Sequence, residues 1–253
     1  MSRIRILPAL VALLAAWLLV SCAGKEPRPI EPVETAMGKA MRQYTRERYF
    51  DAAERFTKMG IDYAGSALMD SITYMQAESQ FQLKEYLLAA ELFEEVISRY
   101  PRSTLVDQCR YRIAESYYEL SPVYGLDQSY TWRAIDEYQA LLDDYPDSEW
   151  TTEASERINE CRRKLAWKEF KSAELYYRMT QYEAALDYID DAVETWYDQP
   201  EIIERALFLK GLCQARMHRD VDARATLKEY LEKYPDSERS PEAKELLDRL
   251  QNG

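Results

Sequence analysis

Residue patterns that could perform acid–base or metal chemistry are hard to find in this chain of 253 residues. His218 is the only histidine, which excludes a histidine-rich metal site and a relay between two histidines. It falls in a polar stretch, residues 216–222, that is typical of a solvated turn. Adjacent acids such as Asp143 and Asp144 do not face each other on a helix, and no Gly-rich phosphate loop occurs. The sequence therefore predicts no enzyme, no catalytic residue, no metal site and no cofactor.

The chain has three cysteines after Cys22 that could form a disulfide or act as thiols. Cys109, Cys161 and Cys213 each fall in a predicted helix, without a Cys-x-x-Cys spacing. Single buried cysteines commonly act as small apolar residues, although an oxidising compartment would permit one disulfide among them. We favour three unpaired or structural thiols, and one disulfide pair is the alternative.

The elements that must position any binding residue are marked by a repeated phrase. A Tyr-Pro-x-Ser sequence closes three acidic amphipathic stretches, and an alanine stands eleven residues before each tyrosine. The three copies are Tyr100-Pro101-Arg102-Ser103, Tyr145-Pro146-Asp147-Ser148 and Tyr234-Pro235-Asp236-Ser237, with weaker copies from Ala52 to Tyr63 and from Ala185 to Trp196. Proline ends a helix because it lacks an amide hydrogen and disfavours helical geometry in the residue before it. Recurrence at this spacing predicts stacked helical hairpins.

Small residues in a common register predict which helices pack together. In the second helix of each hairpin they are Ala52, Ala89, Ala134, Ala185 and Ala223, and in the first helix Ala40, Ala77, Ala114, Ala173 and Gly211. The third hairpin fits this register if about eight residues are inserted near 121–129. A large residue follows four positions after each second-helix alanine: Phe56, Phe93, Tyr138, Ile189 and Leu227. Small residues let helix backbones approach, and the large residue fills the gap against the next hairpin.

This register resembles the tetratricopeptide repeat, a helical hairpin of roughly 34 residues. We expect an all-α solenoid of about five helical hairpins, with repeats 1–3 in residues 36–148 and repeats 4–5 with a capping helix in residues 149–253. The fourth repeat should contain one unusually long helix, from Trp150 to about Tyr177. The closing helix is predicted from Ser240 to Leu250, with Pro241 in its first turn.

The first residues have the layout of a secretory signal. Arg3 and Arg5 precede an apolar run from Leu7 to Val20, which is short for a stable membrane span. Residues 19–22 resemble the bacterial lipobox, so residues 1–21 are expected to be a lipoprotein signal peptide and Cys22 the lipidated residue. Residues 22–35 contain three prolines and are expected to form a tether. The alternatives are an uncleaved anchor helix and an ordinary signal peptide. The expected location is the periplasmic face of the outer membrane.

Net charge limits the partners. After removal of the signal, 31 basic and 45 acidic residues leave a formal charge of −14. This argues against nucleic acid or anionic lipid binding through a general basic field. Partners must therefore be bound locally.

Aromatic residues concentrate at two positions of the first helices. Three residues before the small anchors stand Met37, Tyr74, Tyr111, Phe170 and Phe208, and four residues after them stand Tyr44, Phe81, Tyr118, Tyr177 and Ala215. Tyrosine suits a half-open groove because it combines an apolar ring with a hydroxyl. These residues either pack the superhelix or line a groove that holds an extended polypeptide.

The chain resembles the BamD family, the lipoprotein of the outer-membrane β-barrel assembly machine. The resemblance spans nearly the whole mature chain and rests on the lipobox, the tether, the five repeats and two segments. The segments are Ser121-Pro122 with Leu126-Asp127-Gln128-Ser129, Thr131 and Ala134-Ile135, and Lys164-Leu165-Ala166-Trp167-Lys168-Glu169-Phe170 with Tyr176-Tyr177. The first repeat departs from the pattern, since residues 60–65 lack the Tyr-Pro close.

The resemblance implies a scaffold that binds unfolded outer-membrane β-barrel proteins and docks on the BamA-type barrel subunit. The N-terminal repeats would hold the substrate, for which the hypothesised contacts are Tyr44, Tyr74, Phe81, Tyr111 and Tyr118. The alternative is a tetratricopeptide lipoprotein adaptor for peptidoglycan synthesis, division or secretion, because the repeat is a generic display platform. A carboxylate-dependent hydrolase ranks far behind both.

Overall fold

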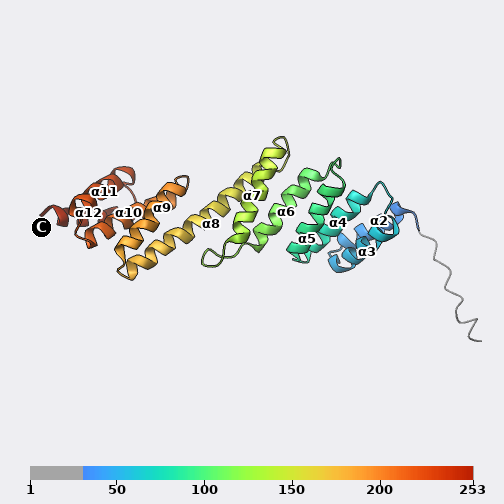
Figure 1. Ribbon diagram of the computed structural model, residues 1–253, viewed down its shortest axis with the longest axis horizontal. Coiled ribbons are helices and arrows are strands. Elements are labelled where there is room, and N and C mark those ends of the chain that lie inside the picture. The colour runs from blue at the N-terminus through green and yellow to red at the C-terminus, as the bar shows by residue number, and fades with distance from the viewer. Residues whose placement is uncertain (1–30, 253) are drawn as a thin grey trace, which may run out of the picture.

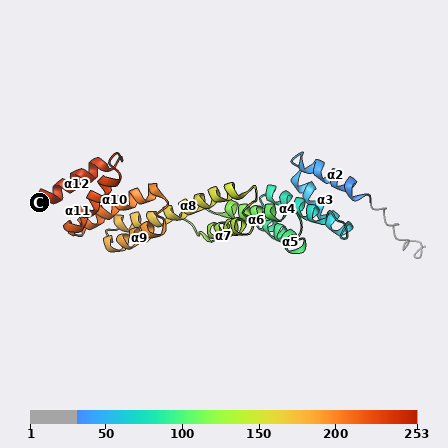
Figure 2. The same cartoon turned by 90° about the horizontal axis from the view of Figure 1, so that it is seen from above.

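The computed structural model describes residues 31–252, which form eleven α-helices and no strand. The helices are α2 (Val33–Tyr44), α3 (Tyr49–Asp62), α4 (Met69–Gln82), α5 (Tyr86–Arg99), α6 (Val106–Leu120), α7 (Ser129–Asp144), α8 (Thr151–Arg178), α9 (Tyr182–Thr195), α10 (Pro200–Arg216), α11 (Asp220–Lys233) and α12 (Ser240–Asn252). They follow one another along an elongated molecule with α2 and α12 at opposite ends (Figures 1 and 2). Five antiparallel pairs and a closing helix confirm the predicted all-α solenoid.

The register of small residues is the packing register. All nine anchor alanines are completely buried, and Gly211 is buried with them. The five large residues one turn after the second-helix alanines are also completely buried. Each hairpin thus contributes a small-residue contact and one large side chain to a continuous core.

Tight turns inside four hairpins rest on a residue with left-handed backbone. These residues are Glu47, Lys84, Thr180 and His218, with φ between 56° and 64°. At Thr180, its own amide donates to the carbonyl of Tyr177 and the next amide donates to Tyr176, both at 3.0 Å. This pair of bonds is the Schellman motif, which satisfies carbonyls left open at a helix end. The third hairpin has a longer connection, the predicted insertion, between the end of α6 at Leu120 and the start of α7 at Ser129.

The turns that leave the second helices share one geometry, with or without proline. An amide donates to the carbonyl of the aromatic residue three positions earlier in all five repeats. The pairs are Ser66 to Tyr63, Ser103 to Tyr100, Ser148 to Tyr145, Gln199 to Trp196 and Ser237 to Tyr234, at 2.8 to 3.3 Å. The first repeat therefore keeps the turn although residues 60–65 lack the Tyr-Pro close.

The serine of the repeated phrase ties each turn to the start of the same hairpin. Ser103 Oγ donates to Asp70 at 2.7 Å, and Ser148 Oγ donates to Asp107 at 2.8 Å. Both acids are second residues of first helices, α4 and α6. Ser237 makes the same contact with Glu204 in α10 at 2.6 Å. The serine of the phrase recurs because its hydroxyl forms a hydrogen bond with an acid in the first helix of the same hairpin.

Helix α8 joins two parts of the core. Ala154 and Cys161 in its first half are buried in the cluster formed with α4 to α7. Leu165 and Phe170 in its second half are buried in the cluster formed with α9 and α10. Its 28 residues agree with the predicted long helix, and Figure 1 shows α8 running between the two halves. Among residues 31–252, no helix combines the length and the apolar character needed to cross a bilayer.

Candidate polypeptide-binding surface

The two aromatic positions of the first helices differ in burial. Tyr74, Tyr111, Phe170 and Phe208, three residues before the anchors, are all at most 9% exposed. The aromatic residues four positions after the anchors are half-buried: Tyr44, Phe81, Tyr118 and Tyr177. The earlier position therefore serves the core, and the later position presents part of each ring at the surface.

Half-buried rings pack against the first residue of the following helix. Tyr44 contacts Tyr49 with ring centroids 5.4 Å apart, and Phe81 contacts Tyr86 at 5.1 Å, both edge to face. Such pairs contribute beyond the area that they bury. They fix the ring orientation before a ligand arrives.

A buried acid links the first three of the hypothesised substrate contacts. Arg112 of α6 binds Glu78 of α4 in a bidentate ion pair, with 2.6 Å between Nη2 and Oε2. The hydroxyls of Tyr44 and Tyr74 donate to the same carboxylate at 3.4 and 3.1 Å. The guanidinium carbon of Arg112 lies 4.0 Å from the centre of the Phe81 ring. Tyr44, Tyr74 and Phe81 thus belong to one network.

The next pair of first helices repeats this arrangement. Arg157 of α8 donates to Glu115 of α6 at 3.0 Å and lies over Tyr118, 4.5 Å from the ring centre. Tyr118 donates its hydroxyl proton to Glu160 at 2.7 Å, and Arg157 also binds Glu160 at 3.0 Å. Tyr111 stacks on Trp150, with centroids 4.8 Å apart. Tyr111 also packs against Tyr138, whose hydroxyl donates to Glu115. Tyr111 and Tyr118 therefore lie in the second network, and the two networks place all five hypothesised contacts on successive first helices.

The protonation states in these networks are fixed near neutral pH. Burial, with the charge of Glu78, raises the pKa of Tyr44 to about 12. Burial and the bond to Glu160 raise the pKa of Tyr118 to about 12, and the same bond lowers the pKa of Glu160. The phenols therefore remain donors and the carboxylate stays charged. Both phenol hydroxyls can therefore donate the hydrogen bonds described above.

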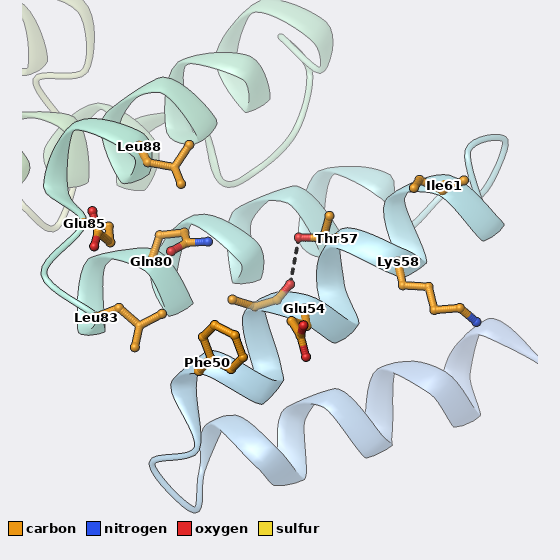
Figure 3. A pocket seen from close by; sticks show the side chains of 10 residues that line it. Phe50, Glu54, Thr57, Lys58, Ile61, Gln80, Leu83, Glu85 and Leu88 are labelled. Atoms are coloured by element: carbon orange, nitrogen blue, oxygen red, sulfur yellow. Dashed lines mark hydrogen bonds between the residues drawn. The ribbon is translucent and has the colours of Figure 1, made fainter.

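An apolar groove that the sequence did not predict lies between α3 and the α4–α5 turn. It encloses about 680 Å³, a volume typical of ligand sites. Its apolar lining includes Phe50, Ile61, Leu83 and Leu88, and its rim carries Glu54, Lys58 and Glu85. Phe50 is 64% exposed and Ile61 76% exposed. In Figure 3, Phe50 and Leu83 lie at one end of the groove and Ile61 and Lys58 at the other.

Phe50 belongs to a row of exposed apolar residues in the same register, and it is the member of that row that lines the groove. Two residues before the anchor of the second helix stand Phe50, Leu87, Trp132 and Val221, all exposed. The fourth repeat has Glu183 at this position. This row lies on the second helices, whereas the predicted contacts lie on the first helices.

The three cysteines and the single histidine lie in different environments. Cys109, Cys161 and Cys213 are buried free thiols, and burial raises their pKa values to about 12, 11 and 12. His218 is exposed in its turn. Residues 31–252 contain no group of His, Cys, Asp and Glu side chains suited to a metal ion. Cys22 lies outside the described residues, so its lipidation stays a prediction.

Comparisons with known proteins agree with this architecture. A family model described as outer membrane lipoprotein, YfiO, matches residues 31–218, and a tetratricopeptide repeat model matches residues 205–237. No curated protein sequence matches the chain.

Solved structures with some similarity include the TPR2AB domain of yeast Sti1 in complex with an HSP90 peptide, 15% identical with a TM-score of 0.45, covering 87% of this chain and 98% of that chain. MamA from Desulfovibrio magneticus RS-1 is 12% identical with a TM-score of 0.38, covering 88% and 98 to 99%. A tetratricopeptide protein of Thermus thermophilus is 16% identical with a TM-score of 0.37, covering 87% and 97%.

Proposed function

The chain belongs to the YfiO family of outer membrane lipoproteins, and from this membership we propose that it is a BamD-type subunit of the β-barrel assembly machinery. In this role it binds unfolded outer-membrane β-barrel proteins and docks on the BamA-type barrel subunit, which promotes insertion of the substrate. The observation that carries the proposal is the family match over residues 31–218, which include both aromatic networks and the apolar groove.

Substrate binding is assigned to the N-terminal repeats. The exposed parts of the Tyr44, Phe81 and Tyr118 rings contact an extended apolar segment. The buried Tyr74 holds Glu78, and the buried Tyr111 packs on Trp150. The groove at Phe50 and Leu88 adds a second apolar contact next to the Phe81 helix. A C-terminal strand of a barrel protein alternates apolar and polar side chains, so such a segment has one apolar face to present to these rings.

Anchoring and docking complete the proposal. Cys22 carries the lipid that holds the chain at the periplasmic face, and burial of its acyl chains in the bilayer supplies the affinity. The C-terminal repeats, α8 to α12, are assigned to the barrel subunit, as the resemblance to the BamD family implies. The scaffold itself acts by holding its partners in place.

Affinity purification of the intact lipoprotein in mild detergent tests the proposed complex. We expect a large β-barrel subunit in stoichiometric amount. Recovery of cell-wall enzymes alone would support the adaptor function and reject the assembly role.

Peptide binding tests the substrate surface. Phe81→Ala combined with Tyr118→Ala should weaken binding of a barrel C-terminal peptide about tenfold or more, because aromatic residues dominate binding energy at such surfaces. Tyr197→Ala is the matched control, since Tyr197 is 78% exposed on another repeat. Fluorescence anisotropy measures the affinity. Unchanged affinity in the folded double alanine variant would refute the assignment.

A further inference from the structure

The first hairpin, α2–α3, carries a concentration of cationic side chains that the proposed function does not use. Lys39, Arg42, Arg46, Arg48 and Arg55 line a hollow of about 150 Å³ together with Gln43. We call this site the basic hollow. Residues 31–62 contain six basic and six acidic residues, whereas residues 63–253 contain 23 basic and 38 acidic residues, a formal charge of −15. The basic hollow is therefore a local exception in an acidic molecule.

The hairpin turn fixes the positions of the cations. Glu47 has a φ of 59°, and the amides of Glu47 and Arg48 donate to the carbonyls of Tyr44 at 2.9 Å and Gln43 at 3.0 Å. Arg55 reaches across from α3 and donates its Nε proton to Gln43 Oε1 at 2.9 Å. The guanidinium groups thus converge on the hollow before any ligand is bound.

Part of this positive charge has no internal partner. Lys39 pairs with Glu31, and Arg48 pairs with Asp51 at 2.6 Å. Arg42, Arg46 and Arg55 form no ion pair within residues 31–252, and Arg42 and Arg46 are exposed. Guanidinium groups bind phosphate oxygens through paired hydrogen bonds, and the hollow has room for one phosphate group.

We propose that the basic hollow binds the phosphate of an anionic phospholipid headgroup at the surface of the bilayer. The location favours this ligand. Ten residues lie between Cys22 and Val33, where α2 begins, so the eleven Cα–Cα steps span at most about 40 Å. The proposal takes this location from the lipid anchor of the proposed function, but the headgroup contact itself needs no anchor.

The charge distribution gives the contact an orienting role. The negative charge of residues 63–253 is repelled by an anionic surface, whereas the basic hollow is attracted to it. The N-terminal end of the solenoid therefore faces the bilayer and the remaining repeats extend away from it. An acidic peptide is the competing ligand class, and it lacks this relation to the tether.

Vesicle sedimentation tests the proposal with the mature chain from residue 22 carrying Cys22→Ser, which removes the lipid. We expect about tenfold more chain bound to vesicles of phosphatidylcholine with phosphatidylglycerol than to phosphatidylcholine alone, with loss of binding at high salt. Arg42→Glu with Arg46→Glu should lower the bound fraction about tenfold or more. Lys244→Glu with Arg249→Glu is the matched control, because it makes the same charge change at exposed residues of α12. Circular dichroism verifies that both variants fold.

Several outcomes would overturn the proposal. Equal binding to both vesicle types would remove the need for an anionic headgroup, and equal loss in both double variants would show a general charge effect. Calorimetric binding of inorganic phosphate at micromolar concentration would assign the hollow to free phosphate, and binding of a poly-glutamate peptide without vesicle binding would assign it to an acidic protein. Recovery of the barrel subunit by affinity purification is independent of all these results, so the two proposals fail separately.

Discussion

Thr180 occupies a backbone conformation that a β-branched residue rarely adopts, with a φ of 60° at the turn between α8 and α9. Its side chain is exposed, so the left-handed backbone is imposed by the turn and not by packing. Thr180→Gly should raise the free energy of unfolding by about 0.5 to 1 kcal/mol, because glycine removes this strain at some cost in chain entropy. Thermal or urea unfolding measures the change.

Ser155→Gly is the matched control for Thr180→Gly. Ser155 is exposed inside α8, where glycine should lower stability by about 0.5 to 1 kcal/mol. If Thr180→Gly destabilised the protein as the control does, the strain at this turn would be absent.

The three buried thiols should be chemically silent in the folded chain. Their raised pKa values, about 11 to 12, leave almost no thiolate at pH 8, and alkylation requires the thiolate. We expect no labelling of Cys109, Cys161 or Cys213 by iodoacetamide in the native state and complete labelling in guanidinium, as read by mass spectrometry. Because the folded pKa values are raised, these thiols favour the folded state below their unfolded pKa, and this contribution is lost as the pH rises through 11 to 12.

An engineered exposed thiol provides the comparison. Ser155→Cys should label quickly in the native protein, because residue 155 lies on the open face of α8. Native labelling of Cys109 at the rate of this thiol would contradict the buried state.

The burial of single residues was predictable where it follows from the register of small and large residues along a helix. Ala77 and Phe93 follow from the register, because small and large residues recur at fixed steps along each helix. The separation between buried Tyr74 and half-buried Phe81 was not predictable, since it depends on Glu78 and Arg112, which lie 34 residues apart. The sequence of one helix does not show which ring faces are covered by residues of another helix.

The serine of the Tyr-Pro-x-Ser phrase forms a hydrogen bond that links the turn after a second helix to the first helix of the same hairpin. Ser148→Ala removes the bond to Asp107 and leaves a carboxylate oxygen with one partner fewer, so we expect the free energy of unfolding to fall by about 1 to 2 kcal/mol. Ser66→Ala is the matched control: the Ser66 hydroxyl accepts a bond from the amide of Leu68 at 3.2 Å and makes no contact with an acid within the described residues. It should cost clearly less. Equal losses in urea unfolding would show that the bond to the acid is not the source of the stability.

Proline is not required for the turn that follows each second helix. Ser66 and Gln199 make the same turn without it, so the Tyr-Pro phrase alone does not predict all five turns. The conformation is set by the aromatic carbonyl and the amide three residues on, which other residues can supply. The long helix and the insertion were predictable because each changes the spacing between the small residues of successive helices. The closing helix was predictable because it follows the last copy of the Tyr-Pro-x-Ser phrase.

Contacts in the whole molecule run mainly between neighbours along the chain, as in other solenoids. Helix α12 covers the last hairpin, where Leu227 and Tyr230 are completely buried. Deleting residues 240–253 should expose this cluster and speed hydrogen exchange in α10 and α11, while α2 to α5 keep their protection. Hydrogen exchange with mass spectrometry measures this directly.

A shorter truncation controls for the loss of the terminus. Removing residues 251–253 keeps Leu250, whose carbonyl accepts a bond from Arg224 at 2.8 Å, and should leave exchange in α10 and α11 unchanged. Uniformly faster exchange along the whole chain after removal of α12 would instead indicate one cooperative unit.

Helix α8 carries a mechanical consequence for any assembly that this chain joins. One continuous run of 28 residues is buried in both cores, so the angular phase between the two halves is set by residue count alone. Adding a single amino acid near its midpoint would rotate one half by about 100° relative to the other and advance it by about 1.5 Å. Partners bound at opposite ends would keep their own contacts with the chain but lose their orientation relative to each other. The length of this helix, more than its composition, therefore sets the relative orientation of such partners.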